Sequence, residues 1–278
     1  MTLMETATIL KHDTTRALKN ALKRALRRKV EQPLPSRVPI RRIKRMIREE
    51  GLALTDGQPS WFYTAYERGT ADPLTNFSLD YIVSSVPKSA RVLVTGCGTG
   101  ITATYLADHG FRQVDGSDLL RECIAVANKI AALGRYENLS FFVADGFNPS
   151  LDGQYDVITA LHWVFSAWMG NYGNTPVDAE KASAPEYRER LLTELLSKYA
   201  PHLAPGGQML IELTDAVTDY RLASDHQMGE HSRRIYPVRH TPEQVEKCAN
   251  AVGLMVADKK LCVSYGHHPR TLYILKKA

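Results

Sequence analysis

Cysteine is scarce in this sequence, and long apolar runs are absent from it. The four cysteines, Cys97, Cys123, Cys248 and Cys262, lie far apart and form no Cys-x-x-Cys pair. This usage argues against a disulfide framework or a zinc site and fits a reducing cytosol. No apolar run approaches the roughly 20 residues that a membrane-spanning helix needs, and the N-terminus, which contains Glu5, has no apolar core typical of secretory signals. We therefore expect a cytoplasmic protein with no transmembrane segment.

Acidic residues are also scarce in the N-terminal part of the chain. Residues 1–50 hold 14 Lys and Arg against 5 Asp and Glu, whereas the remaining residues hold 21 against 25. The chain of 278 residues has a formal net charge of +5. This asymmetry predicts a basic helical extension over residues 1–60 and a slightly acidic main domain over residues 61–278.

Two amphipathic helices are predicted in the basic extension. Thr14–Val30 places leucines on one stripe with lysines and arginines opposite, and Pro39–Glu50 does the same with isoleucines and arginines. Two interpretations remain open. The favoured one is a cap whose apolar stripe packs on the main domain or on a second copy in a homodimer, because a charge run on a helix is usually a solvated face. In the other interpretation, the basic faces of the helices bind nucleic acid or an anionic membrane surface.

A glycine-rich loop organises the main domain. The apolar, β-branched run Val92–Val94 is typical of a buried parallel strand, and Gly96, Gly98 and Gly100 follow it at alternate positions. A helical pattern, Ile101–His109, begins directly after the loop. This order of strand, loop and helix brings backbone N–H groups and a helix N-terminus close to a ligand.

The loop does not match the two commonest nucleotide-binding patterns. The dinucleotide fingerprint fails because its third glycine position is occupied by Ile101, and no Gly-Lys-Ser/Thr triplet follows for a phosphate loop. The remaining Gly-x-Gly-x-Gly pattern resembles motif I of the class I S-adenosylmethionine-dependent methyltransferases, from about Arg91 to the C-terminus. The resemblance implies that the loop, formed by Gly96, Cys97, Gly98, Thr99 and Gly100, cradles S-adenosylmethionine. Val94 departs from the family, which usually has an acid there for the amino group of the cofactor.

From Arg91 onward, strand and helix patterns alternate strictly, which predicts an α/β, doubly wound, mostly parallel seven-stranded sheet with a C-terminal antiparallel hairpin, in addition to the N-terminal helical cap. The expected strands are Val92–Val94, Gln113–Ser117, Leu139–Ala144, Tyr155–Leu161, Gln208–Leu213, Met255–Tyr265 and Thr271–Leu275. The expected helices are Asn76–Val86, Ile101–His109, Leu119–Leu133, Tyr187–His202 and Thr241–Gly253, the last with a capping box. We expect Pro205–Gly207 to form a turn and Ser166–Pro185 to form a long connection.

Acids follow two of the expected strands at the edge where open α/β sheets bind ligands. Asp118 lies 22 residues after Gly96, a spacing that brings a carboxylate to the ribose hydroxyls of a nucleoside. The resemblance implies that Asp145 accepts from the adenine amino group. The further predicted cofactor contacts are Leu119, Gly146, Phe147 and Leu161. The alternatives are a solvated turn for Asp118 and an Asx turn for Asp145.

The acceptor side of the predicted site is rich in aromatic residues. His162 follows the fourth strand, where the resemblance implies acceptor-side groups, and a neutral imidazole can act there as a general base. The resemblance also implies an N-terminal lid over the cofactor, from which Tyr66 is predicted to reach the site; the alternative for Tyr66 is a core aromatic cluster. Trp163, Trp168 and Tyr172 are predicted to form a wall around the acceptor, although each of these side chains has a packing role as its alternative. The end of the fourth strand and the segment after the fifth strand do not display the Asp/Asp/Asn set that catechol-type methyltransferases use for magnesium, so we predict no metal.

These patterns together predict an S-adenosylmethionine-dependent methyltransferase that acts on a small-molecule acceptor by O- or N-methylation. One alternative is an RNA methyltransferase that uses the basic helices, although Leu161-His162-Trp163-Val164 does not match the Asn-Pro-Pro-Tyr motif of base N-methylation. A second alternative is a non-catalytic cofactor-binding or scaffold protein, which the valine at position 94 favours slightly.

Overall fold

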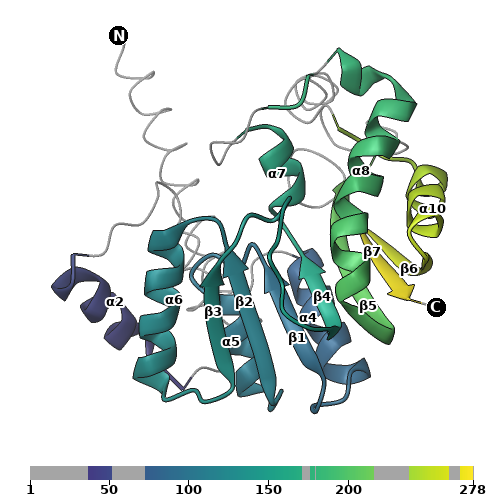
Figure 1. Ribbon diagram of the computed structural model, residues 1–278. Coiled ribbons are helices and arrows are strands. Elements are labelled where there is room, and N and C mark those ends of the chain that lie inside the picture. The colour runs from purple at the N-terminus through teal and green to yellow at the C-terminus, as the bar shows by residue number, and fades with distance from the viewer. Residues whose placement is uncertain are drawn as a thin grey trace, which may run out of the picture.

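The described part of the computed structural model is one α/β sheet with helices on both faces (Figure 1). It comprises residues 37–51, 73–170, 176–178, 180–215, 238–262 and 270–277. The strands are β1 (Arg91–Thr95), β2 (Gln113–Asp118), β3 (Leu139–Val143), β4 (Tyr155–Ala160), β5 (Leu203–Thr214), β6 (Leu254–Cys262) and β7 (Arg270–Lys277). They form a seven-stranded sheet in the order β3-β2-β1-β4-β5-β7-β6. β1 to β5 pair in parallel, and β7 pairs antiparallel with both β5 and β6, which confirms the predicted fold class.

The described helices cover the two faces of the sheet in two sets. The α-helices are α2 (Ile40–Glu49), α4 (Pro73–Ser85), α5 (Ile101–Asp108), α6 (Arg121–Gly134), α7 (Val164–Trp168), α8 (Pro185–Tyr199) and α10 (Pro242–Ala251), with short 3-10 turns at η1 (Lys181–Ser183) and η2 (Ala200–His202). α2, α4, α5 and α6 contribute to one apolar core, and α7, α8 and α10 contribute to the other. No helix in this part of the chain combines the length and apolarity that crossing a membrane requires.

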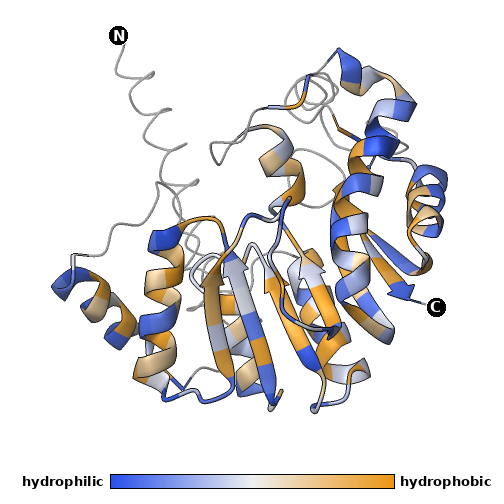
Figure 2. Cartoon of the chain, viewed as in Figure 1, coloured by the Kyte–Doolittle hydropathy of each residue, from blue (hydrophilic) through white to orange (hydrophobic). Residues whose placement is uncertain are grey.

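The central strands read as continuous apolar runs because both of their faces are buried. Successive side chains of a strand point to opposite faces, so Val92 and Val94 enter one core and Leu93 enters the other. Figure 2 shows β1 and β4 largely in the orange of hydrophobic residues. This two-sided burial fixes the central strands and leaves their carboxyl ends as the open edge of the sheet.

The second predicted N-terminal helix is present as α2, and its apolar stripe packs on the main domain. Ile43 is fully buried and Met46 nearly so, while Val38, just before the helix, lies against Gly134 at the end of α6. The arginines of α2 that face solvent are Arg41, Arg42, Arg45 and Arg48. The packing supports the cap interpretation for this helix. The first predicted helix, Thr14–Val30, lies outside the described residues.

Two connections differ from the sequence prediction. Pro205–Gly207 is not a turn before the fifth strand but part of β5, where the register slips between Tyr155 opposite Leu203 and Val157 opposite Gln208. None of these three residues has a partner in the two ladders of β5, and Gly206 has a φ of 71°, so the local turn signal takes the form of a bulge inside the strand. The segment expected as a long connection, Ser166–Pro185, holds the end of α7 and all of η1, and both elements are too short to show a helical period in the sequence.

The predicted capping box opens α10. Thr241 accepts from the Gln244 N–H, and the Gln244 side chain accepts from the Thr241 N–H at 2.9 Å. His240 lies directly before this cap and is buried between α8 and β5. Its backbone N–H donates to the Thr214 carbonyl of β5, and its Nε2–H donates to the Arg188 carbonyl of α8, each over about 3 Å. Burial lowers the pKa of His240 to about 4.

We predict that His240 makes the protein less stable as pH falls. In the unfolded chain the imidazole takes up a proton below about pH 6.5, whereas the folded protein resists this down to about pH 4. The unfolded state therefore binds more protons between these values, and the free energy of unfolding should fall by about 3 kcal/mol across this window. Urea unfolding across this pH window should show that His240→Gln removes most of this loss, whereas His202→Gln, near the surface, does not. An unchanged pH dependence in His240→Gln would contradict this account.

Candidate functional site

The glycine-rich loop adopts a backbone that only glycine enters without strain. Gly96, Gly98 and Gly100 have φ values of 61°, 54° and 83°. The loop is closed by hydrogen bonds from the Cys97 N–H to the Ser117 carbonyl and from the Gly100 N–H to the Cys97 carbonyl, both 2.9 Å. Gly100 is the N-cap of α5, so the loop ends in a helix N-terminus, as the sequence predicts.

Asp118 lies beside this loop at the carboxyl end of β2. Its Oδ2 accepts from the Gly98 N–H at 2.7 Å, and its Oδ1 accepts from the Leu120 N–H at 2.9 Å. Burial raises the pKa of Asp118, and these backbone N–H groups oppose the rise. The neighbouring Leu119 is 38% exposed, an apolar side chain open to solvent at the site. A carboxylate beside an exposed apolar face has the chemistry to bind a ribose next to a flat base.

Asp145, after β3, forms the Asx turn that the sequence analysis kept as its alternative. Its Oδ1 accepts from the Phe147 N–H at 2.9 Å. The Gly146 carbonyl accepts from the Tyr199 hydroxyl of α8 at 2.7 Å, which ties this loop to the neighbouring helix. The turn fixes the loop at the same edge as Asp118, and the role of Asp145 toward adenine stays a prediction.

Trp163 fills the space between the glycine loop and the loop after β3. An ideal Cβ placed on Gly96 would lie 2.3 Å from Trp163 Cδ1, and one placed on Gly146 would lie 2.5 Å from Trp163 Cη2. The indole N–H donates to Thr95 Oγ1 at 3.0 Å, and the side chain is buried. The sequence analysis predicted Trp163 as part of the acceptor wall, but the structure places it against both loops predicted to hold the cofactor.

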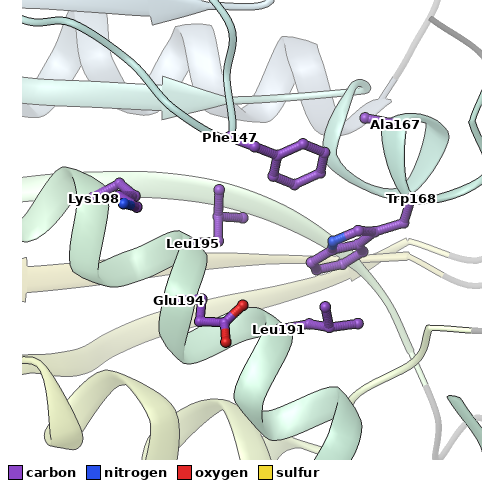
Figure 3. Close-up of a pocket in the computed structure, with 7 residues that line it drawn as sticks. All are labelled: Phe147, Ala167, Trp168, Leu191, Glu194, Leu195 and Lys198. Carbon is purple, nitrogen blue, oxygen red and sulfur yellow. The ribbon is translucent and has the colours of Figure 1, made fainter. Parts of the chain in front are cut away.

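Phe147 and Trp168 line a pocket of about 430 Å³ beside these loops (Figure 3). Their rings are stacked at 25°, with centroids 6.2 Å apart, and Phe147 also meets the edge of Trp163 at 5.5 Å. The rest of the lining is Ala167 of α7 and Leu191, Glu194, Leu195 and Lys198 of α8. A residue predicted for the cofactor and one predicted for the acceptor therefore share one aromatic pocket.

His162 follows the buried Leu161 at the end of β4 and is surrounded by polar groups. Its Nδ1 lies 3.4 Å from Glu212 Oε2 of β5 and 3.2 Å from Arg270 Nη1 of β7. Its Nε2 makes a short contact with the Thr75 hydroxyl of α4. The side chain of His162 is 31% exposed, whereas that of Glu212 is completely buried. The arrangement can hold an imidazole in a fixed orientation at the carboxyl edge of the sheet.

The sequence analysis missed the three residues around His162. A signal was available for two of them, because Glu212 and Arg270 are charged residues next to the apolar runs of their strands. Thr75 carried no such signal. The predicted Tyr66 and Tyr172 lie outside the described residues, so their roles stay predictions. In the described ranges, no three His, Cys, Asp or Glu side chains are grouped to hold a metal ion.

The protein-family comparison gives a match over most of the chain. A family model described as a methyltransferase domain, Methyltransf_23, matches residues 63–258. A comparison with curated protein sequences finds no match.

Solved structures of similar fold share little sequence with this chain. Magnesium protoporphyrin IX methyltransferase (ChlM) from Synechocystis PCC 6803 with bound SAH has a TM-score of 0.57 and 16% identity, over 84% of this chain and 100% of that one. The YcgJ protein from Bacillus subtilis has a TM-score of 0.51 and 16% identity, over 73% and 98%. The [4+2]-cyclase SpnF has a TM-score of 0.51 and 15% identity, over 76% and 82%. At these identities the likeness shows the fold alone.

We predict that Gly96→Ala destabilises the protein more than Gly98→Ala. Both glycines have positive φ, so both substitutions cost about 1–2 kcal/mol of backbone strain. A Cβ on Gly96 would also collide with Trp163, whereas one on Gly98 meets no atom within 4 Å. Urea unfolding without ligand should show an additional loss of about 1–3 kcal/mol for Gly96→Ala. Equal losses in the two variants would show that Trp163 does not pack tightly on the loop.

Proposed function

The chain belongs to the methyltransferase domain family, and we propose that it methylates a small-molecule acceptor on oxygen or nitrogen. As a member of this family it is an S-adenosylmethionine-dependent methyltransferase, with S-adenosylmethionine as its cofactor. The observation that carries the proposal is the convergence of the glycine loop, Asp118 and His162 at one edge of the sheet. The glycine loop and Asp118 fit a nucleoside cofactor. His162 fits a residue on the side from which an acceptor approaches the cofactor.

The residues at the carboxyl edge fit S-adenosylmethionine. The backbone of Gly96–Gly100 would cradle the methionyl part, and the ionised Asp118 would accept from the ribose hydroxyls. Leu119 and Phe147 would offer apolar faces to adenine, and Asp145 would accept from its amino group. The exposed side chain of Leu119, next to a half-buried carboxylate, supports this placement.

On the acceptor side, the chain must align the acceptor and remove its proton. The bound cofactor supplies an electrophilic methyl group on a sulfonium. A displacement of this kind needs the acceptor atom in line with the methyl group, and an O–H or N–H acceptor must also lose a proton. His162 is our candidate base, because it lies at the strand end next to β1 and its ring is partly open to solvent. Tyr66 and Tyr172 would complete the acceptor pocket, as the sequence analysis proposes.

The position of α2 supports a small-molecule acceptor over RNA. Val38 packs on Gly134 at the C-terminal end of α6, whereas α6 begins just after the carboxyl end of β2. α2, which carries these exposed arginines, therefore begins beside the end of α6 that lies toward the opposite edge of the sheet from Asp118 and His162 (Figure 1). The protoporphyrin methyltransferase among the structural neighbours is named for a small-molecule acceptor, whereas the cyclase shows that this fold also supports other chemistry.

Asp118→Ala should weaken binding of S-adenosylhomocysteine by about 1.5–3 kcal/mol, the range for hydrogen bonds to a charged group. Titration calorimetry on the full-length protein measures this directly, and NAD should not bind. The matched control is Asp156→Ala, since Asp156 accepts a backbone N–H from Arg91 at the amino end of the strands. Asp118→Asn, which keeps an acceptor for the loop, separates loss of the ligand contact from collapse of the loop. Tight NAD binding without a response to S-adenosylhomocysteine would overturn the cofactor assignment.

His162→Ala should lower methyl transfer by roughly 10²- to 10⁴-fold, the usual contribution of a positioned base. Transfer from labelled S-adenosylmethionine to a panel of small phenols, alcohols and amines provides the assay. Affinity for S-adenosylhomocysteine should stay unchanged, because His162 serves the acceptor. His202→Ala is the control, since His202 ends η2 directly before β5, at the far edge of the sheet. Near-normal transfer in His162→Ala would remove its role as base, and lost cofactor binding would make it part of the cofactor site.

A further inference from the structure

The pocket in Figure 3 lies behind the cofactor loops rather than at the carboxyl edge of the sheet. Its wall is formed by Phe147 of the loop after β3, by the α7 residues around Trp168, and by one side of α8. Neither His162 nor the glycine loop lines it. Trp163 stands between the two places, because it packs against Gly96 of the glycine loop and meets the ring of Phe147. The pocket is therefore separate from the site proposed for methyl transfer.

The pocket lies beside a connection that contains no helix. Residues 144–154 join the parallel strands β3 and β4 without one, whereas such crossovers usually carry a helix that covers the sheet. Tyr199 of α8 holds this loop instead, through its hydrogen bond to the Gly146 carbonyl. The side of α8 that carries Leu191, Glu194, Leu195 and Lys198 therefore borders an open space of about 430 Å³.

The apolar part of this space suits a flat ring system. The rings of Phe147 and Trp168 lie within 25° of parallel, with centroids 6.2 Å apart. Leu191 and Leu195, one helical turn apart on α8, add an aliphatic surface. A volume of this size falls in the range of small-molecule sites, and aromatic walls favour stacking with a flat ligand. Two fused aromatic rings fit these dimensions.

The indole N–H of Trp168 supplies a hydrogen-bond donor inside the pocket. The side chain is only 4% exposed, and no residue of the described part of the chain accepts from this N–H. Figure 3 shows the nitrogen on the side of the ring that faces Phe147 and Leu195. A buried tryptophan N–H usually has a partner, as that of Trp163 has in Thr95. The donor of Trp168 is therefore available to an oxygen of a ligand.

The charges around the pocket favour an anionic ligand. Lys198 lies at the other end of the pocket from Trp168 in Figure 3, is exposed, and makes no ion pair with a described residue. Glu194 also lines the pocket, but its carboxylate lies 3.9 Å from Arg190 Nε, which balances its charge. Two cations and one acid leave a net positive charge at this side of α8.

We propose that this pocket is a second ligand site, which binds a flat aromatic carboxylate that carries another oxygen at the opposite end of its ring system. The rings lie against Phe147 and the two leucines, the carboxylate meets Lys198, and the other oxygen accepts from the Trp168 N–H. The site uses no residue of the proposed methyl transfer, so the inference goes beyond that function. Its occupant touches the loop predicted to hold adenine, because the Phe147 N–H donates to Asp145.

Titration calorimetry of the full-length protein with three naphthalene probes tests the proposal. The probe 6-hydroxy-2-naphthoate carries both polar groups, 2-naphthoate lacks the hydroxyl, and 2-naphthol lacks the carboxylate. We expect the first to bind with a dissociation constant of roughly 1 mM or tighter, and each of the others to bind about 2- to 10-fold more weakly. No binding of the first probe, or equal binding by either of the others, would overturn the proposal whether or not any variant folds.

Two substitutions assign the polar contacts. Trp168→Phe keeps an aromatic ring and removes the N–H, so it should weaken 6-hydroxy-2-naphthoate by about 2- to 10-fold and leave 2-naphthoate unchanged. Lys198→Ala should weaken both carboxylates by about 2- to 5-fold and leave 2-naphthol unchanged. Lys181→Ala is the control, since Lys181 is an exposed lysine of η1 outside the pocket. Equal losses for all three probes in either folded variant would contradict the assigned contacts.

Titrations with S-adenosylhomocysteine present distinguish a second site from the proposed catalytic one. The probe should still bind when the protein is saturated with S-adenosylhomocysteine, because Trp163 separates the pocket from the glycine loop. Displacement of the probe would make the pocket part of the cofactor site, and methylation of the probe hydroxyl would make it the acceptor site. Either result would overturn the proposal. Lack of methyl transfer to any small molecule would instead remove the proposed function and leave this site in place.

Discussion

The parallel register of β1 with both of its neighbours is the constraint on which the site depends. Thr95 pairs with Ser117 of β2 and with Ala160 of β4. The next residues of the three strands therefore lie side by side at the carboxyl ends of the strands. These residues are Gly96, Asp118 and the segment Leu161–His162. Every contact described for the cofactor and acceptor sides is built on that common edge. A register shift of one residue in β1 would separate the loop from its acid.

Two carboxylate–arginine pairs show how similar chemistry serves different purposes in this fold. Asp115 and Arg91 pair toward the amino edge of the sheet, where the guanidinium also lies over the Tyr155 ring. Glu212 and Arg270 pair toward the carboxyl edge, where the carboxylate also reaches His162. Both pairs satisfy a buried acid, but only the second holds a backbone in the left-handed region next to a titratable ring. The second pair therefore supports the strand end at which His162 stands.

The fold and the position of the glycine loop beside Asp118 were predictable because their signals are local. Alternating glycines after an apolar strand, an acid after the next strand and a Thr–Gln capping box each depend on neighbouring residues, and the structure contains the expected elements. The cluster around His162 was not predictable in the same way, because it requires β7 to insert beside β5 and bring Arg270 to Glu212, 58 residues away. Pro205–Gly207 form an unpaired bulge inside β5, because strand pairing continues on either side of them at Leu203 and Gln208. The position of Trp163 depends on two loops that meet only in the folded chain.

A crystal structure of the protein with S-adenosylhomocysteine would test the central claim most directly. The account predicts the ligand over the glycine loop, with its ribose hydroxyls on Asp118, its adenine beside Leu119 and Phe147, and its sulfur directed toward His162. In such a complex the Asp118 carboxylate would exchange or share its contact with the Gly98 N–H. A ligand bound elsewhere, or one whose sulfur faces away from His162, would contradict the assignment of this edge as the catalytic site.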